Sequence, residues 1–130
     1  MRKEIFASQR YFKLSDIVVS HGQLLLRSQK DEKNSNNIDI IFFSTTFMQI
    51  ISELEGVQIS LMTDESKIEY PSVKKYLSYT SNHLFEIQSN DEHYYVVAAF
   101  VRVFENRLNF NETSLNFDNI GRENEIASSI

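Results

Sequence analysis

The chain has 130 residues and a mass of 15.2 kDa, which suits one domain built around a single hydrophobic core. Hydrophobic residues make up 42% and charged residues 24%, so the composition is typical of a globular protein and excludes a disordered one. There is no cysteine, which excludes disulfides, thiolate metal sites and thiol nucleophiles. The formal net charge of −5 argues against a nucleic-acid partner, because phosphate binding needs clustered Lys and Arg.

The sequence predicts neither an export signal nor a membrane partner. Ser8, Gln9 and Arg10 interrupt the apolar residues after the basic start of the chain, so we expect no signal peptide. The longest apolar run, Tyr94 to Val101, is far shorter than the roughly 20 residues that a helix needs to cross a bilayer. Together with the lack of cysteine, these features predict a cytoplasmic protein.

The first part of the chain is typical of a β-hairpin followed by a buried strand. Residues 11–19 and 24–27 are rich in large apolar side chains, and Gly22 between them can adopt the positive φ of a turn. Residues 30–37 contain no apolar side chain, which predicts an exposed loop. Residues 38–43 are apolar on both faces, which predicts a buried strand.

Residues 46–54 have two interpretations. Their apolar side chains recur at helical spacing, Thr46 and Gln49 match a capping box, and Gly56 stands where a helix would end. We therefore expect a short helix. The alternative is that the preceding strand continues, bends and returns. Residues 57–62 then alternate apolar and polar side chains, which predicts a half-exposed strand at an edge of the sheet.

The second half predicts one helix and a meander of three strands. Pro71 suits the first turn of a helix, and the apolar stripe that follows predicts an amphipathic helix over residues 71–80. Residues 84–88 and 93–104 predict a hairpin, and residues 108–110 predict a third, returning strand. The middle strand is apolar on both faces, so we expect it to be the central, buried strand of the sheet.

Together these elements predict an α+β, β-rich fold: a single, mostly antiparallel sheet of about six strands with one or two short helices. The sheet is either open and partly covered by helix, or curled towards a barrel. In this interpretation residues 1–117 form a single globular domain. Residues 118–130 have little apolar content, so we expect a loosely held tail.

The sequence predicts no metal site and no cofactor. The histidines are His21, His83 and His93. A four-residue turn in the second hairpin would place His83 opposite Ala98, about five strand residues from His93, which is too far for the two imidazoles to share a metal ion. A phosphate-binding glycine loop and a nucleophile elbow are both absent from the sequence, so nothing in it indicates catalysis.

Two charged residues interrupt apolar strands. Asp39 lies within residues 38–43, and Arg27, near the end of the preceding strand, can pair with it if both are buried. The alternative, which we favour from the pattern alone, is that Asp39 faces solvent at an edge. Arg102 would need a carboxylate partner if it were buried, but we favour a strand that leaves the core at that point.

The sequence predicts a class of protein rather than a specific function. We expect a small, non-enzymatic protein-interaction domain of the adaptor, regulator or inhibitor type, whose acidic charge favours a basic partner. The alternative is a small-ligand-binding protein or enzyme with a pocket in a curled sheet, for which Asp39, Arg27 and Arg102 are candidates. Tyr79 lies off the helical stripe and is a candidate surface contact. The unprotected strand over residues 57–62 also favours a homodimer.

Overall fold

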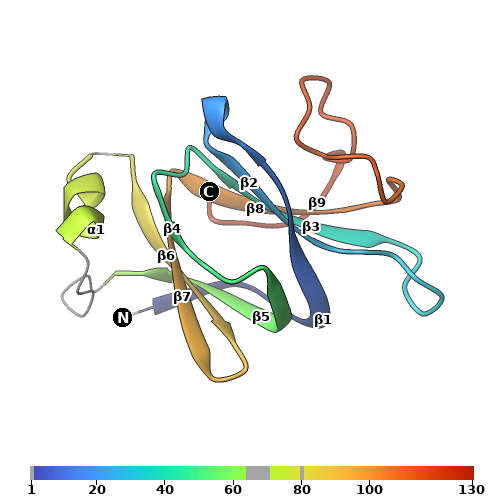
Figure 1. Ribbon diagram of the computed structural model, residues 1–130, viewed down its shortest axis with the longest axis horizontal. Coiled ribbons are helices and arrows are strands. Elements are labelled where there is room, and N and C mark those ends of the chain that lie inside the picture. Colours follow the sequence, from blue (N-terminus) through green and yellow to red (C-terminus); the bar gives the residue numbers. More distant parts are fainter. Residues whose placement is uncertain (1, 64–70, 80) are drawn as a thin grey trace.

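The part of the chain that the structure describes is mainly β: one nine-stranded antiparallel sheet, one short helix and a 3₁₀ turn (Figure 1). The computed structural model describes residues 2–63, 71–79 and 81–130. Over these residues the strand order is β4-β7-β6-β5-β1-β2-β3-β8-β9, and the sheet is neither closed nor strongly curled. The elements are β1 (Arg2–Val18), η1 (Val19–His21), β2 (Gln23–Ser28), β3 (Asn37–Phe43), β4 (Phe47–Gln49), β5 (Glu53–Met62), α1 (Pro71–Leu77), β6 (His83–Ser89), β7 (Glu92–Ala98), β8 (Phe100–Asn106) and β9 (Asn124–Ser128).

β1 is the middle strand of the sheet and joins its two halves. Residues 2–13 of β1 pair with β5, and residues 13–18 pair with β2. The register shifts twice along β5 and once along β2. Because an extra residue in one strand bends that strand, β1 can lead from one half of the sheet into the other. One half contains β4, β7, β6 and β5, and the other contains β2, β3, β8 and β9.

The main core lies where the two halves of the sheet meet. Phe42 of β3 and Phe85 of β6 pack edge to face, with ring centroids 5.7 Å apart, although β5, β1 and β2 separate their strands in the sheet. Burial of large apolar side chains on this scale is the main source of folding free energy. Other fully buried members of this core are Phe12, Leu24, Leu26, Ile40, Ile59, Ile87, Val96, Val101 and Val103.

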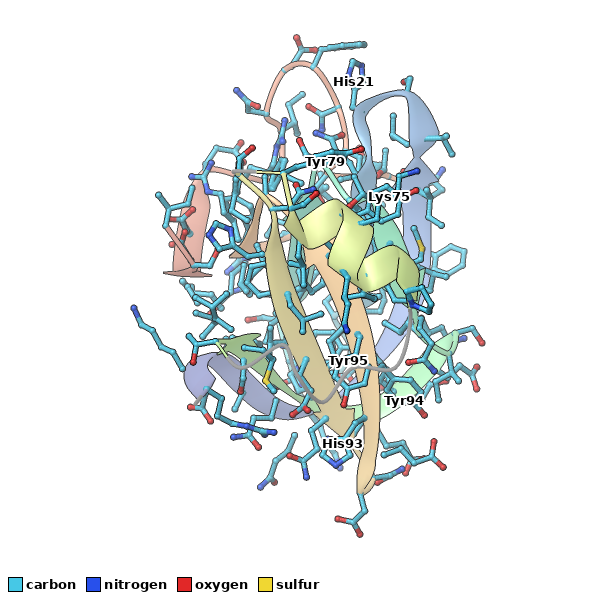
Figure 2. The ribbon with its side chains drawn as sticks, turned by 90° about the vertical axis from the view of Figure 1, so that its left-hand side faces the viewer. His21, Lys75, Tyr79, His93, Tyr94 and Tyr95 are labelled. Atoms are coloured by element: carbon cyan, nitrogen blue, oxygen red, sulfur yellow. The ribbon has the colours of Figure 1, made fainter. Side chains whose placement is uncertain are left out.

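α1 covers the outer face of the first half of the sheet, in front of β6 and β7 in Figure 2. Val73 of the helix is buried and clusters with Leu84 of β6 and Val97 of β7. The predicted helix is thus confirmed in place, with the Pro71 start, but it ends at Leu77 rather than at residue 80. Residue 80 lies outside the described residues.

Both predicted hairpins are confirmed. β1 and β2 pair in antiparallel fashion through the turn at η1. In the β6–β7 hairpin, Gln88 faces His93 and His83 faces Ala98, as the turn length predicted. The two central residues of this turn both have positive φ, and such turns match the twist of the flanking strands. Turn length and strand alternation are local features, which is why the sequence predicted this register.

The predicted helix over residues 46–54 is wrong, and the alternative of a bent, returning strand is closer. Phe47–Gln49 form β4, and β5 begins at Glu53. The Thr46 N–H donates to the Val97 carbonyl oxygen at 2.9 Å, just before β4 pairs with β7. This pairing with a strand distant in sequence overrides the helical spacing of the apolar residues.

The predicted strand over residues 93–104 is divided at Ala99. The Ala99 N–H donates to the Phe43 carbonyl oxygen at 2.9 Å, and β7 and β8 lie in different halves of the sheet. Both are interior strands, because β7 lies between β4 and β6 while β8 lies between β3 and β9. The returning strand over residues 108–110 is wrong: β9, from the segment expected to be a loose tail, pairs with β8 instead.

The predicted edge over residues 57–62 is also wrong, because β5 lies between β1 and β6. The edges of the described sheet are β4, which is three residues long, and β9. The sheet has nine strands rather than about six, partly because residues 47–49 form β4 and the predicted strand over residues 93–104 is divided into β7 and β8. Residues 2–10, to which we assigned no element, lengthen β1. The barrel-like alternative is wrong for the described residues, and the only helices there are α1 and the 3₁₀ turn.

Gly22 is the residue of the β1–β2 turn that least tolerates a side chain. Its φ is 62°, and a Cβ atom there would lie 2.8 Å from the Thr45 backbone nitrogen. We therefore expect Gly22→Ala to lower the free energy of unfolding by about 2–3 kcal/mol. Gly56→Ala is the control, because its φ is also positive but the nearest neighbour of its Cβ, the Ser8 carbonyl oxygen, lies at an ordinary 3.5 Å. Urea denaturation measures both, and equal losses would contradict a role for the Thr45 contact.

Candidate functional site

The candidate site is the irregular segment of residues 107–123, which connects β8 to β9 (orange in Figure 1). Irregular segments of this length inside a domain are usually either functional or disordered. This one covers the outer face of the second half of the sheet, where Leu115 is buried in a cluster with Leu25, Ile41 and Phe104. The segment is thus anchored by its own apolar residue on β2, β3 and β8.

A buried ion pair beneath the segment fixes its position. Arg27 donates from Nε to Asp39 Oδ1 at 2.7 Å and from Nη2 to Asp39 Oδ2 at 2.8 Å. Its Nη1 donates to the Glu112 carbonyl oxygen at 2.6 Å. Asp39 is fully buried, so the solvent-facing position that we favoured for it is wrong and the buried pair is right. The cause is the β2–β3 register, which places Arg27 directly opposite Asp39.

Asp39 also accepts hydrogen bonds from the beginning and the middle of this region. Asn106 Nδ2 and Ser114 Oγ donate to Asp39 Oδ2 at 2.9 and 2.7 Å. Asn106 Nδ2 also lies 3.0 Å from the Gly121 carbonyl oxygen, to which it donates. Hydrogen bonds to an ionised group are stronger than those between neutral groups. One carboxylate therefore ties the beginning and the middle of the segment to β3, and Asn106 carries this connection to its end.

The C-terminal part of the segment is held by a second set of contacts. Asn116 Oδ1 accepts from the Ile120 N–H at 3.0 Å, and Arg122 donates from Nη2 to the Asn116 carbonyl oxygen at 2.7 Å. The Arg122 guanidinium lies 5.9 Å from the ring centroid of Phe43. Burial of the Arg122 guanidinium lowers its pKa, and the nearby positive charge of Arg102 lowers it further. With both ends attached, the segment has a fixed conformation.

Large apolar side chains stand exposed on this fixed segment. Phe110 is 86% exposed and Phe117 is 92% exposed, and Ile120 is 51% exposed. We call these three side chains the loop patch. The Phe117 ring packs edge to face against His21 of the neighbouring η1 turn, with ring centroids 5.9 Å apart. Val19 of the same turn is also exposed. Exposed aromatic side chains are candidates for contact with a partner protein, because aromatic residues are enriched at interfaces.

A cleft of about 950 Å³ runs between the segment and the β1–β2 hairpin. We call it the hairpin cleft. Thr113 Oγ1 crosses it and donates to Asp16 Oδ2 at 2.6 Å. Its charged and aromatic lining consists of four basic residues, three acidic residues and two aromatic ones: Arg10, Lys13, Arg27, Lys30, Asp16, Asp31, Glu112, Tyr11 and Phe110. The cleft can therefore offer charged and aromatic contacts to one ligand.

The other two candidates from the sequence lie elsewhere. Arg102 pairs with Glu125 of β9 and lies over the Phe104 ring, 5.1 Å from its centroid, with its side chain 38% exposed. Tyr79 follows α1 and is 51% exposed, beside the helix in Figure 2. Of the four candidate residues, the structure brings only Arg27 and Asp39 together.

Glu86 is a buried carboxylate, although its alternation with the apolar Phe85 and Ile87 is a pattern typical of a solvent-facing side chain. It is 3% exposed, and its Oε1 lies 2.7 Å from Arg2 Nη1. Its Oε2 lies 3.3 Å from His93 Nδ1, and Tyr95 donates to it at 3.4 Å. The hairpin register that we predicted places Tyr95 opposite Glu86, and this was the signal that could have located the cluster.

The histidines do not gather. His83 Nδ1 lies 3.0 Å from the Ala99 carbonyl oxygen, whereas His93 lies at the far end of the β6–β7 hairpin near Glu86. Figure 2 labels His93 and His21 at opposite ends of the molecule. Among the residues that the structure describes, no group of three His, Asp or Glu side chains could hold a metal ion.

Comparison with known proteins adds no relative: no protein-family model matches the sequence, and no curated protein or solved structure matches it significantly. In the part of the chain that the structure describes, no helix is long and apolar enough to cross a membrane. The candidate site therefore rests on geometry alone: a fixed segment, an exposed loop patch and the hairpin cleft beside them.

Proposed function

We propose that the protein is a non-enzymatic protein-interaction domain that binds its partner through segment 107–123. The observation that carries this proposal is the exposure of Phe110 and Phe117 on a segment that is otherwise fixed by the buried Arg27–Asp39 pair. Aromatic side chains are enriched at protein interfaces, where a few of them supply most of the binding free energy. An adaptor, regulator or inhibitor would use such a surface.

The rigid support of the loop patch favours binding. Association loses free energy when side chains and loops become ordered at an interface, and a segment that is already held in place avoids part of this loss. Asp39 accepts from Arg27, Asn106 and Ser114, so the ordering is supplied by folding itself. A buried ion pair adds little to stability when it is compared with apolar side chains in the same place. Its role beneath this exposed surface is therefore to fix the segment.

A small-ligand-binding function is the second candidate, because the volume of the hairpin cleft lies within the range of ligand pockets. Arg27 lines this cleft, so one of the residues expected for a ligand site lies there, whereas its partner Asp39 is buried beneath it. The curled sheet that we expected around such a pocket is not present in the residues that the structure describes. A cytoplasmic location and a basic partner, both expected from composition, stay predictions.

We expect the Phe110→Ser/Phe117→Ser double variant to lose its partner while it keeps its fold. Each side chain is largely exposed, so little packing is lost, whereas an aromatic anchor contributes roughly 2 kcal/mol or more to binding. The measurement is capture from native lysate with the wild-type and variant proteins as bait, followed by mass spectrometry and thermal melting. Tyr79→Ser is the matched control, because Tyr79 is also exposed but lies beside α1.

Two outcomes would contradict the proposal. Either the double variant captures the same proteins as the wild type, or Tyr79→Ser loses them equally. Light scattering on the purified chain separates a special case, in which the partner is a second copy. A wild-type mass near twice that of one chain, together with a single-chain mass for the double variant, would identify a homodimer that forms through the loop patch. The homodimer that we expected from the sequence would pair through an exposed edge at residues 57–62. These residues do not form an edge, so a homodimer would have to use the loop patch instead.

A further inference from the structure

Arg122 is a half-buried cation that has no carboxylate partner among the described residues. Its Nη2 donates to the Asn116 carbonyl oxygen and to Asn119 Oδ1, which are both neutral acceptors. Its Nε atom is buried and has no acceptor, and its Nη1 group makes no hydrogen bond to the described part of the chain. A guanidinium can donate five hydrogen bonds in a planar fork, so most of this capacity is unused at Arg122.

The charges around Arg122 leave its own charge uncompensated. Burial and the positive charge of Arg102 both lower the pKa of Arg122, whereas a carboxylate beside the guanidinium would raise this pKa. The carboxylates nearest to it in sequence are engaged or point into solvent. Glu125 pairs with Arg102, Glu123 Oε1 accepts from a backbone N–H of its own turn at 2.6 Å, and Asp118 is exposed. The unused donors of Arg122 therefore coincide with an unpaired positive charge.

Arg122 lines a pocket of about 310 Å³ between segment 107–123 and the β1–β2 turn, whose His21 is labelled at the top of Figure 2. We call it the arginine pocket. Its other polar lining residues are His21, Gln23 and Asn116, and within the described residues no Asp or Glu lines it. The Gln23 amide makes no hydrogen bond to the described chain, whereas Asn116 Oδ1 already accepts from the Ile120 N–H. The pocket thus offers donors and one uncompensated positive charge.

The arginine pocket is continuous with the loop patch, because Phe117 belongs to both. A partner that packs on Phe117 therefore covers the pocket and removes water from the Arg122 guanidinium. Loss of water around an unpaired charge costs free energy, unless the partner supplies an opposite charge that also accepts the unused hydrogen bonds. We infer that the arginine pocket binds an aspartate or glutamate side chain of the protein partner, an inference that rests on the proposed function.

The size of the arginine pocket fits this occupant. Its volume lies at the low end of the range for ligand pockets, which suits one side chain of a partner. The net charge of the chain is −5, but charges beyond a Debye length of about 8–10 Å are largely screened. Arg122 therefore selects a carboxylate at this one position, even if the rest of the partner surface is basic.

The test is an NMR titration of the Arg122 Nε–H resonance with two dipeptides whose ends are blocked, phenylalanyl-glutamate and phenylalanyl-glutamine. The two probes differ only in the charge of one side chain. We expect the glutamate probe to shift this resonance saturably and to bind about tenfold or more tightly than the glutamine probe. Added sodium chloride should weaken the glutamate probe alone. This comparison uses the wild-type protein, so it does not depend on the folding of any variant.

Arg122→Gln should weaken the glutamate probe about tenfold or more, as followed by the backbone resonances of Gln23 and Phe117. Arg107→Gln is the matched control, because Arg107 is an exposed arginine of the same segment, lies outside the pocket and undergoes the same change in charge. It should leave the binding of the probe unchanged. Because Arg122 also donates to Asn116, thermal melting reports any loss of fold in the variant.

Equal binding of the two dipeptides, no saturable shift with either, or equal losses in the two arginine variants would overturn the inference. Tighter binding of inorganic phosphate than of the glutamate probe would also overturn it, in favour of a site for small free anions. The captured partner separates this inference from the proposed function. If Arg122→Gln keeps that partner while the Phe110→Ser/Phe117→Ser variant loses it, the inference fails but the proposed function stands.

Discussion

Asp39→Ala should destabilise the protein by about 3–5 kcal/mol, because removal of one partner leaves the other charge buried without compensation. Arg27 is 5% exposed and would keep its charge in this buried position, with the Glu112 carbonyl oxygen as its remaining acceptor. Asn106 and Ser114 would each lose an acceptor as well. Such a loss is a large part of the 5–15 kcal/mol that ordinarily stabilises a domain. Urea denaturation of the variant measures it.

The control for this result is the second cross-strand ion pair of the same half of the sheet. Arg102 and Glu125 are both partly exposed, so Glu125→Ala should cost less than about 1 kcal/mol. The Arg27→Met/Asp39→Leu double variant should recover part of the lost stability, because apolar side chains can replace a buried ion pair. If Asp39→Ala and Glu125→Ala cost the same, the buried pair does not hold segment 107–123. Limited proteolysis of this segment gives an independent readout of its anchoring.

Val97→Asp should largely unfold the protein, with a loss of more than about 4 kcal/mol. Val97 is a fully buried residue of β7, and its side chain clusters with Leu84 of β6 and Val73 of α1. A carboxylate at this position would have no hydrogen-bond donor of its own among these apolar side chains, and burying an unpaired charge is among the most destabilising single changes. Circular dichroism and urea denaturation measure the loss.

The matched substitution for this prediction is Ile51→Asp, which introduces the same side chain at a position that is 48% exposed between β4 and β5. We expect it to change the free energy of unfolding by no more than about 0.5 kcal/mol. A Val97→Asp protein that melts near the wild-type temperature would contradict the packing of α1 on β7. Large losses in both variants would mean that the Ile51 region is more constrained than its exposure indicates.

The candidate site was only partly predictable. The sequence pointed to Arg27 and Asp39, because a charged residue inside an apolar strand needs a partner when it is buried. It did not decide between the buried pair and an exposed Asp39, since this depends on whether segment 107–123 covers β3. The exposed Phe110 was assigned to a returning strand for a related reason: an alternating pattern looks the same whether or not the neighbouring place in the sheet is free.

The sequence by itself determined the features that depend on neighbours along the chain. Strand alternation and turn residues determined the two hairpins, including the register that places His83 opposite Ala98. Tertiary structure alone decided that β1 pairs with β5, that β4 pairs with β7, and that β8 pairs with β3 and β9, because these pairs join segments far apart in sequence. It thereby made residues 47–49 a strand rather than a helix, and gave the place beside β8 to β9. The physical reason is that a sheet edge accepts any strand with compatible alternation, so the choice depends on burial summed over the whole fold rather than on local pattern.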